Sequence, residues 1–146
     1  MKQISTRFSM AVHTLSLIDM CPLECTGDFI AASVNTNPVV IRRIMSMLKK
    51  AGLIEVRAGV GGAYLLRKPE QITLLDIYRA VHAADENQLF GIHGDSNIAC
   101  PVGRSIEQVL QQELLDAQHV MEQRLARTTL DQLNEQFAMT SSSIEQ

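Results

Sequence analysis

The sequence predicts a mainly α-helical protein with one small β-hairpin. Two observations lead to this fold class. Along most of the chain, apolar residues recur at three- and four-residue steps, which is the spacing of amphipathic helices. In one place this spacing gives way to two short apolar runs separated by a glycine-rich turn, which is typical of a hairpin.

Length and composition limit the class of protein. With 146 residues, of which 46% are hydrophobic and 20% charged, the chain can form one domain with an appendage and bury a real core. No apolar run approaches the ~20 residues of a membrane span, and the first residues lack the apolar stretch of a signal peptide. Three Cys without framework spacing argue against a disulfide-stabilised secreted domain. We therefore expect a cytoplasmic protein without a membrane partner.

Two helices are predicted in the first quarter of the chain. Residues 5–19 carry apolar side chains at helical spacing, with Ser5 as N-cap and Pro22 as the residue that stops the helix. A short second helix opens at Thr26 and continues to about Val34. The polar residues that follow indicate a tight turn.

A third helix is predicted to begin directly after this turn. Asn37 is a favourable N-cap, and Pro38 suits the first helical position because no amide donor is needed there. Gly52 ends the helix after about Ala51. The inward stripe of this helix comprises Ile41, Ile44, Met45 and Leu48. The other side carries mostly polar and basic residues, namely Val39, Arg42, Arg43, Ser46, Lys49 and Lys50.

The hairpin follows this helix. Residues 53–57 and 63–67 are predicted to be its two strands, and the tip at 58–62 contains three glycines. Pro69 ends the second strand, and Thr73 caps a fourth helix with apolar residues at helical spacing. We assign residues 1–83 as a whole to one domain.

The rest of the chain divides into a loop and two helices. Residues 84–104 show no clear period and are predicted to be a loop. From Ser105 a helix about 35 Å long carries an apolar stripe that needs a partner surface, because the helix leaves a small domain. The stripe comprises Ile106, Leu110, Leu114, Ala117, Met121 and Leu125. A break at 128–129 precedes a last short helix that ends near residue 137, and residues 138–146 are expected to be disordered.

Charge is distributed unevenly along the chain. The formal net charge is −3, yet residues 37–68 hold seven Lys and Arg against one Glu, a local net charge of +6. Residues 1–36 carry −1 and residues 69–146 carry −8. A basic segment between acidic ones can bind a polyanion locally. An ordinary solvated face would give the same numbers, so charge alone leaves both interpretations open.

Three short helices followed by a glycine-tipped hairpin are the element order of a winged helix-turn-helix domain. Its third helix would enter the major groove, where Arg can bond guanine, Asn can read adenine and Val can contact a thymine methyl. Basic residues toward the end of that helix and on the wing would contact phosphates, and a glycine-rich tip lets backbone approach the duplex. The predicted DNA-binding residues are Ser5, Arg7, Asn35, Thr36, Asn37, Val39, Arg42, Arg43, Ser46, Lys49, Lys50, Arg57, Gly59, Gly61 and Gly62.

Several segments resemble the Rrf2 family of bacterial transcriptional regulators, the group that contains IscR, NsrR and CymR. Residues 37–54, with Asn-Pro-Val-Val-Ile-Arg-Arg-Ile and then Leu-Lys-Lys-Ala-Gly-Leu-Ile, resemble the family's recognition helix. The other segments that resemble family members are the opening helix (5–8), the wing (57–69) and the next helix (72–81). The resemblance covers roughly residues 4–136. Residues 35–40 and the Cys-Pro-Val-Gly at 100–103 are similar in particular to the YwnA-like branch.

The resemblance implies a homodimer paired through C-terminal helices at 105–137 that binds a near-palindromic operator in double-stranded DNA, as a repressor. The apolar stripe fits this role, and packing within one chain is the alternative. Iron–sulfur members of the family hold their cluster with three closely spaced Cys before the long helix, but here that loop has only Cys100. We therefore expect no iron–sulfur cluster, no metal and no other cofactor, although His93 or Asp95 could supply borrowed ligands.

Cys100 is a candidate redox sensor. It directly precedes Pro101 at the start of the long helix, with Arg104 nearby. A helix N-terminus and a cation both stabilise a thiolate, which predicts a thiol that reacts with an oxidant or forms a mixed disulfide. An inert Cys that fills space is the other interpretation. Cys21 and Cys25 are expected to be loop or core thiols.

The sequence thus predicts a DNA-binding transcriptional regulator and no enzyme. It shows no inferable pair of nucleophile and base, no metal-binding spacing among the four His and no complete phosphate-binding loop. A small molecule or an oxidant is the expected effector. Two other functions remain open: a protein-interaction adaptor on the same fold without specific DNA binding, and a metal or iron–sulfur sensor.

Overall fold

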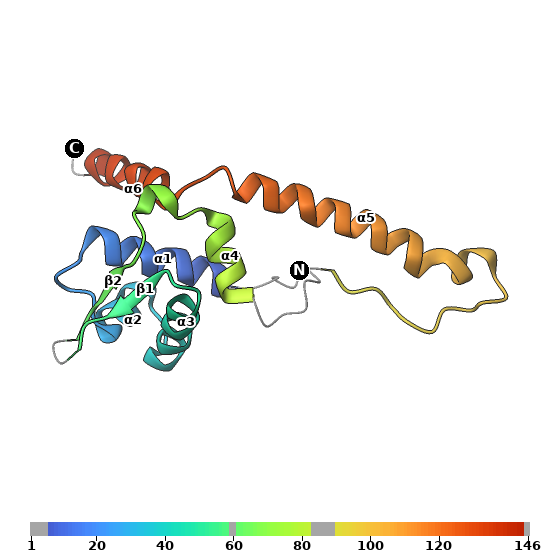
Figure 1. The fold of residues 1–146 in the computed structure, drawn as a ribbon, viewed down its shortest axis with the longest axis horizontal. Coiled ribbons are helices and arrows are strands. Elements are labelled where there is room, and N and C mark those ends of the chain that lie inside the picture. The colour runs from blue at the N-terminus through green and yellow to red at the C-terminus, as the bar shows by residue number, and fades with distance from the viewer. Residues whose placement is uncertain (1–5, 59–60, 83–89, 145–146) are drawn as a thin grey trace.

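The chain folds into helices around a small hairpin, which confirms the predicted fold class. The structure is a computed structural model that describes residues 6–58, 61–82 and 90–144. Within these ranges the elements are α1 (Arg7–Met20), α2 (Gly27–Val34), α3 (Pro38–Lys50), β1 (Ile54–Val56), β2 (Ala63–Leu65), the 3-10 helix η1 (Pro69–Gln71), α4 (Leu74–His82), α5 (Pro101–Leu125) and α6 (Leu130–Ile144). Figure 1 shows α1 to α4 and α6 gathered in one body, from which α5 projects.

The hydrophobic core lies where α1, α3 and α4 meet. Leu15 of α1, Ile41 of α3 and Ile77 of α4 are completely shielded from solvent, as is Ile30 of α2. Burial of one such side chain stabilises the fold by ~1.5–3 kcal/mol relative to leaving it exposed. This packing uses the apolar stripe of α3 and thereby directs its opposite face outward.

The hairpin is an antiparallel pair, β1 with β2, whose register sets Glu55 opposite Tyr64. Each strand has three residues, fewer than the five predicted, although an Arg57 N–H bond to the Gly62 carbonyl (2.9 Å) extends the ladder toward the tip. At the start of β2, next to the tip, the Ala63 N–H donates to the carbonyl of Cys25 at 3.1 Å. The hairpin is therefore tied to the loop between α1 and α2.

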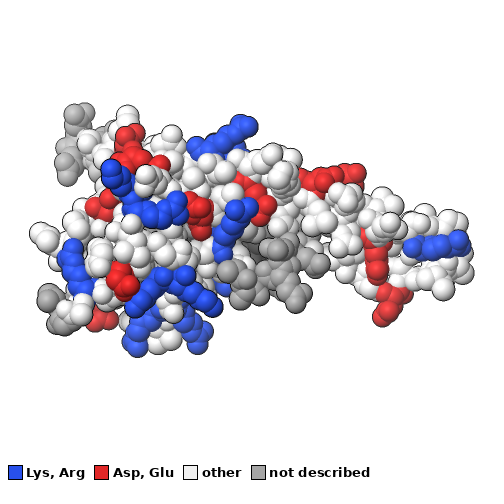
Figure 2. Space-filling model, viewed as in Figure 1, with Lys and Arg blue, Asp and Glu red and all other residues white. Residues whose placement is uncertain are grey.

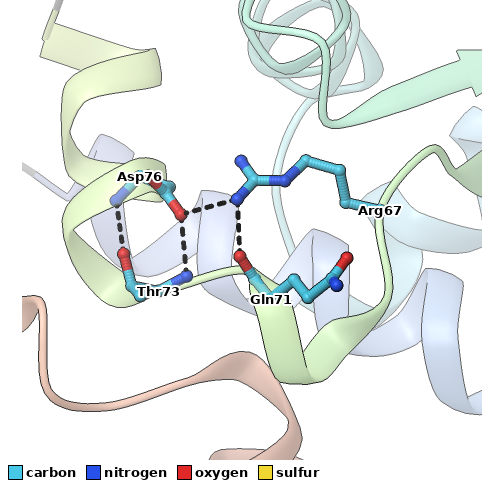
Figure 3. A network of polar contacts seen from close by, with 4 residues as sticks. All are labelled: Arg67, Gln71, Thr73 and Asp76. Atoms are coloured by element: carbon cyan, nitrogen blue, oxygen red, sulfur yellow. Dashed lines mark hydrogen bonds and ion pairs between the residues drawn. The ribbon is translucent and has the colours of Figure 1, made fainter.

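The first turn of α4 is held by a network of polar contacts (Figure 3). The Asp76 carboxylate accepts from the Thr73 N–H at 3.0 Å, and the Thr73 hydroxyl accepts from the Asp76 N–H at 3.1 Å. This reciprocal pair is a capping box, which satisfies two N–H groups that the helix leaves unpaired. Arg67 adds an ion pair to Asp76 (3.4 Å) and donates to the Gln71 carbonyl (2.6 Å). The prediction that Thr73 caps this helix is confirmed.

The C-terminal helix α6 returns to the body of the molecule. Its N-terminus is joined to that of α4 by a bridge between Thr73 and Thr129, and the Leu130 N–H donates to the Ile72 carbonyl at 2.8 Å. The Leu130 side chain is completely buried. Further along, the Asn134 amide donates to the Asp19 carboxylate of α1 at 2.7 Å, so that α6 covers α1.

In contrast, α5 extends away from the body (Figure 1). It contacts α4 near its C-terminal end, and Gln118 is its one buried residue. Most of its large apolar side chains are half-buried or exposed, as Val109 (61% exposed) and Val120 (63%) illustrate. No described helix is long and apolar enough to cross a membrane.

Three boundary predictions need correction. First, α5 begins at Pro101, so the predicted loop at 84–104 ends four residues early; Pro is well tolerated in a first turn. Second, the predicted disordered tail at 138–146 is helical to Ile144, because α6 is anchored to the body near its start. Third, the predicted last short helix does not end near residue 137 but belongs to α6, which begins at Leu130 and packs on the N-terminal body. The N-cap of α1 is Thr6; the predicted cap, Ser5, lies outside the described residues.

Candidate DNA interface

The turn between α2 and α3 is fixed by local hydrogen bonds. Asn35 adopts a left-handed backbone (φ 62°), which Asn tolerates better than most residues, and the Thr36 N–H closes the end of α2 on the Ala31 carbonyl at 3.0 Å. The Asn37 side-chain oxygen then accepts from the Val39 N–H at 2.8 Å and caps α3, as predicted. The chain between the two helices is therefore rigid, and it sets the direction in which α3 leaves the body.

The end of α3 is equally well defined. Gly52 has a left-handed φ of 78°, and two bonds close the helix: Gly52 N–H to the Lys49 carbonyl and Leu53 N–H to the Leu48 carbonyl, both at 3.0 Å. This is the Schellman arrangement, for which glycine is favoured. Lys49 and Lys50 lie in the last turn, where positive charge interacts favourably with the helix dipole.

The outer face of α3 is polar, basic and exposed. Its exposed residues are Val39, Arg42, Arg43, Ser46, Lys49 and Lys50. On the other side Ile41, Ile44 and Leu48 are buried, which confirms the two faces predicted from the sequence. Figure 2 shows Lys and Arg side chains gathered over α3. This face can accept a polyanion without moving the core.

One cation of this face is partly neutralised inside the molecule. The Lys49 Nζ lies 3.1 Å from the Glu55 carboxylate of β1. A hydrogen bond from the Val56 backbone and the contact with Lys49 hold the pKa of Glu55 below its usual value. Because this pair is exposed, we assign it little stability; its effect is to fix Lys49 beside the hairpin.

The hairpin presents a second basic side chain beside α3. The Arg57 guanidinium lies over the Tyr64 ring, 5.7 Å from its centroid, which is a cation–π contact. Tyr64 was not among the predicted interface residues; an aromatic residue on the strand that follows the glycine-rich tip was the available signal. Gly61 and Gly62 have left-handed φ values of 73° and 85°, so the tip needs glycine there. The remaining predicted tip residue, Gly59, lies outside the described residues.

Arg7 has a structural contact. Its guanidinium donates to the Val81 carbonyl in the last turn of α4 at 2.9 Å, and the residue is half-buried. It therefore lies at the α1–α4 junction rather than on the outer face of α3. Ser5, predicted to act with it, lies outside the described residues.

The three Cys occupy different environments, and all are free thiols. Cys25 is buried, and its thiol donates to the Leu17 and Cys21 carbonyls, both at 3.0 Å. Burial, with smaller contributions from Cys21 and Glu24, raises the pKa of Cys25 to about 11. The prediction of a core thiol is confirmed for this residue.

Cys100 is exposed at the N-cap position of α5. The backbone N–H groups of Gly103 and then Val102 lower the pKa of its thiol, although the sulfur forms no well-aligned cap hydrogen bond. The predicted effect of Arg104 is absent: its Nε donates to the Ile98 carbonyl at 3.0 Å, and it does not contribute to the pKa of Cys100. The interpretation of Cys100 as a buried space-filling residue is wrong, because the side chain is exposed.

The segment before α5 is folded tightly onto its first turn. The Cys100 N–H donates to the Asn97 carbonyl at 3.2 Å, and a Cβ on Gly103 would clash with that same carbonyl. Glycine is therefore required at 103. Among the residues that the structure describes, no group of three or more His, Cys, Asp and Glu could hold a metal ion.

A rigid helix with a basic outer face beside a hairpin wing defines a protein of the winged helix-turn-helix class. Residues 4–136 match the model of the Rrf2 family, described as iron-dependent transcriptional regulators. The chain belongs to this family of transcriptional regulators.

Individual relatives agree with this assignment. The chain is 45% identical over 135 residues to YwnA of Bacillus subtilis, a candidate HTH-type transcriptional regulator, with 92% of this chain and 99% of YwnA covered. A crystal structure described as that of a candidate DNA-binding protein is 40% identical, with a TM-score of 0.71 over 87% of this chain and 97% of the other. CymR of B. subtilis, 20% identical over 92% of this chain and 98% of CymR, has a TM-score of 0.59 and shows the same fold.

Proposed function

We propose that the protein is a homodimeric repressor that binds a near-palindromic operator in double-stranded DNA, in the cytoplasm. The observation that carries this proposal is the exposed outer face of α3, with its basic residues and rigidly capped ends. A helix presented in this way fits the major groove, where side chains read base edges.

Within this interface the residues have different roles. Arg43 is exposed on α3 and contacts base edges, together with Val39 nearer the helix start. Lys50 and Arg57 contact phosphates, which position the protein without reading sequence. Lys49 joins them once the duplex phosphate competes with Glu55 for its ammonium group.

The dimer is formed through α5. Its predicted stripe includes Leu110 and Leu114, which remain half-buried, while Ala117 is exposed in a single chain. A second copy of α5 would cover this surface and leave the two copies of α3 facing the same side of a duplex. Half-sites about one helical turn apart, ~34–36 Å, are expected for such a dimer.

The proposal is tested by DNA selection. Genomic fragments retained by the purified protein are sequenced, and binding to the enriched site is measured by fluorescence anisotropy at fixed salt. We expect a dissociation constant of ~10⁻⁸–10⁻¹¹ M for the operator and ~10⁻⁴–10⁻⁶ M for unrelated DNA. Equal affinity for both would instead support the protein-interaction adaptor. A reporter gene placed under control of the enriched site distinguishes a repressor from an activator, because a repressor lowers its expression.

We further propose that Cys100 makes this regulator responsive to oxidants. The thiol is exposed, and the start of α5 favours its thiolate. Attack of the thiolate on hydrogen peroxide would break the O–O bond and yield a sulfenic acid and hydroxide, which takes up a proton from solvent to give water. Peroxide should lower operator affinity in the natural protein and leave that of Cys100→Ser unchanged. An equal response in both proteins would refute this role.

A further inference from the structure

A cavity of about 520 Å³ lies between α1, α3 and α4 and borders the outer face of α3 at Lys50. Its apolar walls come from α3, from the two residues Ala51 and Leu53 that follow α3 closely, and from α4, while α1 contributes Arg7. The apolar lining residues are Met47, Ala51, Leu53, Ala80 and Val81. Small-molecule sites in proteins commonly have this size and an apolar lining with a few polar groups.

The polar groups at this cavity are mostly cations. Four basic side chains line it, namely Arg7, Lys50, Arg67 and Arg79. The one acidic lining residue, Asp76, already accepts from the Thr73 N–H and from Arg67. The cavity therefore carries an excess of positive charge next to an apolar surface.

Two of these cations are available to a ligand. Lys50 and Arg79 are exposed and make no hydrogen bond or ion pair with any residue that the structure describes. Arg67 and Arg7, in contrast, are held by carbonyl groups at 2.6 Å and 2.9 Å. An anion in the cavity would thus gain two charged partners without breaking bonds between described residues.

We propose that this cavity binds an organic anion with an apolar body, of the class of medium-chain carboxylates, and that it is the effector site of the regulator. The carboxylate would lie between Lys50 and Arg79, and the hydrocarbon part would cover Ala51 and Ala80. The ligand complements the cavity in two ways: its carboxylate matches the basic side chains, and its hydrocarbon part matches the apolar wall. An inorganic anion would leave the apolar wall uncovered, and a cation would be repelled by the basic side chains.

The regulatory part of this inference rests on the proposed function. Lys50 belongs both to the cavity and to the basic face of α3. A carboxylate beside Lys50 neutralises a charge that would otherwise contact a DNA phosphate. The bound anion should therefore weaken operator binding.

Binding is tested without DNA, with octanoate as the probe. The protein is labelled with ¹³C at the alanine methyl groups, and octanoate, octylamine and sodium phosphate are titrated separately. We expect saturable shifts of the Ala51 and Ala80 signals with octanoate alone. Equal shifts with octylamine, no saturable shift, or shifts confined to Ala117 of α5 and Ala126 directly after it would overturn the proposal.

Variants separate the cavity from the DNA interface. Arg79→Gln should weaken octanoate binding by about tenfold or more, since hydrogen bonds to charged groups are strong. Lys68→Gln, an exposed cation that does not line the cavity, is the matched control and should bind octanoate normally. Ala51→Leu, at an exposed position, narrows the cavity and should also weaken binding. Unchanged affinity in Arg79→Gln and Ala51→Leu would refute the site.

The link to DNA is measured with the same proteins. Octanoate should lower the operator affinity of the natural protein but not of Arg79→Gln, whose affinity without octanoate should be unchanged. Octanoate binding without any effect on operator affinity would refute the regulatory part. A protein that binds no operator at all would contradict the proposed function instead, and the alanine signals would still report on the cavity.

Discussion

At the scale of single residues, the basic side chains of the interface differ in the partners that they already have. Arg42 and Arg43 form no hydrogen bond or ion pair with the described residues, whereas Lys49 is paired with Glu55 and Arg57 lies over Tyr64. A side chain without a partner can reorient toward a base edge. A basic side chain that already has a partner stays in place, as Lys49 and Arg57 do, and is better placed to contact a backbone phosphate.

The first prediction compares Arg43→Ala with Lys49→Ala. If Arg43 reads a base, its removal should cost about 1–3 kcal/mol at the operator and relax sequence preference. Lys49→Ala should weaken operator and unrelated DNA alike and reduce the salt dependence of binding. Anisotropy titrations at several salt concentrations measure both effects. Identical behaviour of the two variants would contradict the division of roles.

The second prediction concerns the order in which the thiols react. Because the pKa of Cys100 is lowered and that of Cys25 is raised to about 11, iodoacetamide at neutral pH should modify Cys100 first and Cys25 only after unfolding. Peptide mass spectrometry after timed alkylation measures this order. Early labelling of Cys25 in the folded protein would contradict its burial.

The raised pKa of Cys25 also has a consequence for stability. A thiol whose pKa is higher in the folded state than in the unfolded state binds more protons when folded. Its contribution is fully present below the unfolded value of 9.0 and is lost as the pH rises toward about 11. The free energy of unfolding should therefore fall as the pH rises over this interval. If the free energy of unfolding of Cys25→Ala falls just as steeply with pH, groups other than Cys25 cause the loss.

At the scale of elements, the helices are defined by residues at their ends. Asn37 caps α3, Gly52 closes it, and Thr73 with Asp76 caps α4. Thr129 and Gln132 exchange hydrogen bonds at the start of α6 in the same way, at 3.0 and 3.3 Å. These bonds fix where each helix begins, and hence which side chains face the core.

The third prediction tests the cap of α4. Thr73→Ala removes the hydroxyl that accepts from the Asp76 N–H and should lower the free energy of unfolding by about 1 kcal/mol. Thr140→Ala is the matched control, because the Thr140 hydroxyl bonds to the Gln136 carbonyl on the exposed face of α6. Its effect should stay within about 0.5 kcal/mol. Urea unfolding of both variants provides the measurement, and equal losses would contradict the role of the cap.

At the scale of the whole molecule, the protein consists of a body, against which α6 packs, and of α5, which projects from that body (Figure 1). The body buries a core within one chain, while α5 leaves Val109 and Val120 exposed and most of its predicted stripe only half-buried. A long helix with an open apolar face favours association, because burying that face is the main source of free energy for pairing.

The fourth prediction tests this association. Leu114→Glu places a charge on the half-buried stripe and should convert the proposed dimer to monomer, with loss of high-affinity operator binding. Gln108→Glu adds the same charge at an exposed position outside the stripe and should remain dimeric. Light scattering after size-exclusion chromatography gives the mass. A natural protein that is monomeric, or a Leu114→Glu variant that stays dimeric, would refute pairing through α5.

Much of the fold followed from local patterns in the sequence. Apolar spacing located α1 to α4, and Asn37, Pro38 and Gly52 set the limits of α3, because capping and backbone preference act over a few residues. The length of α6 did not follow, since the helix is anchored near its start, where Leu130 and Asn134 contact distant parts of the chain. The polar residues at 138–146 by themselves do not indicate that the helix is anchored in this way.

For the candidate interface, sequence reasoning found the outer face of α3 but not the contacts that orient it. The Lys49–Glu55 pair and the Arg57–Tyr64 contact depend on the pairing of β1 with β2 and on its position beside α3. Arg7 was predicted as a DNA-binding residue, and only the structure shows that its guanidinium bonds to Val81, 74 residues away. Such contacts depend on how separate elements meet, which local spacing does not encode.

By itself, the sequence determined the helices, the hairpin, their order and the family to which the chain belongs, because these depend on residue type and short-range spacing. The tertiary structure alone decided that α6 returns to α1, that α5 projects from the body (Figure 1), and that Lys50 and Arg79 line the same cavity. The physical reason is range: periodicity and capping act between neighbours in the chain, whereas burial and charge act between neighbours in space.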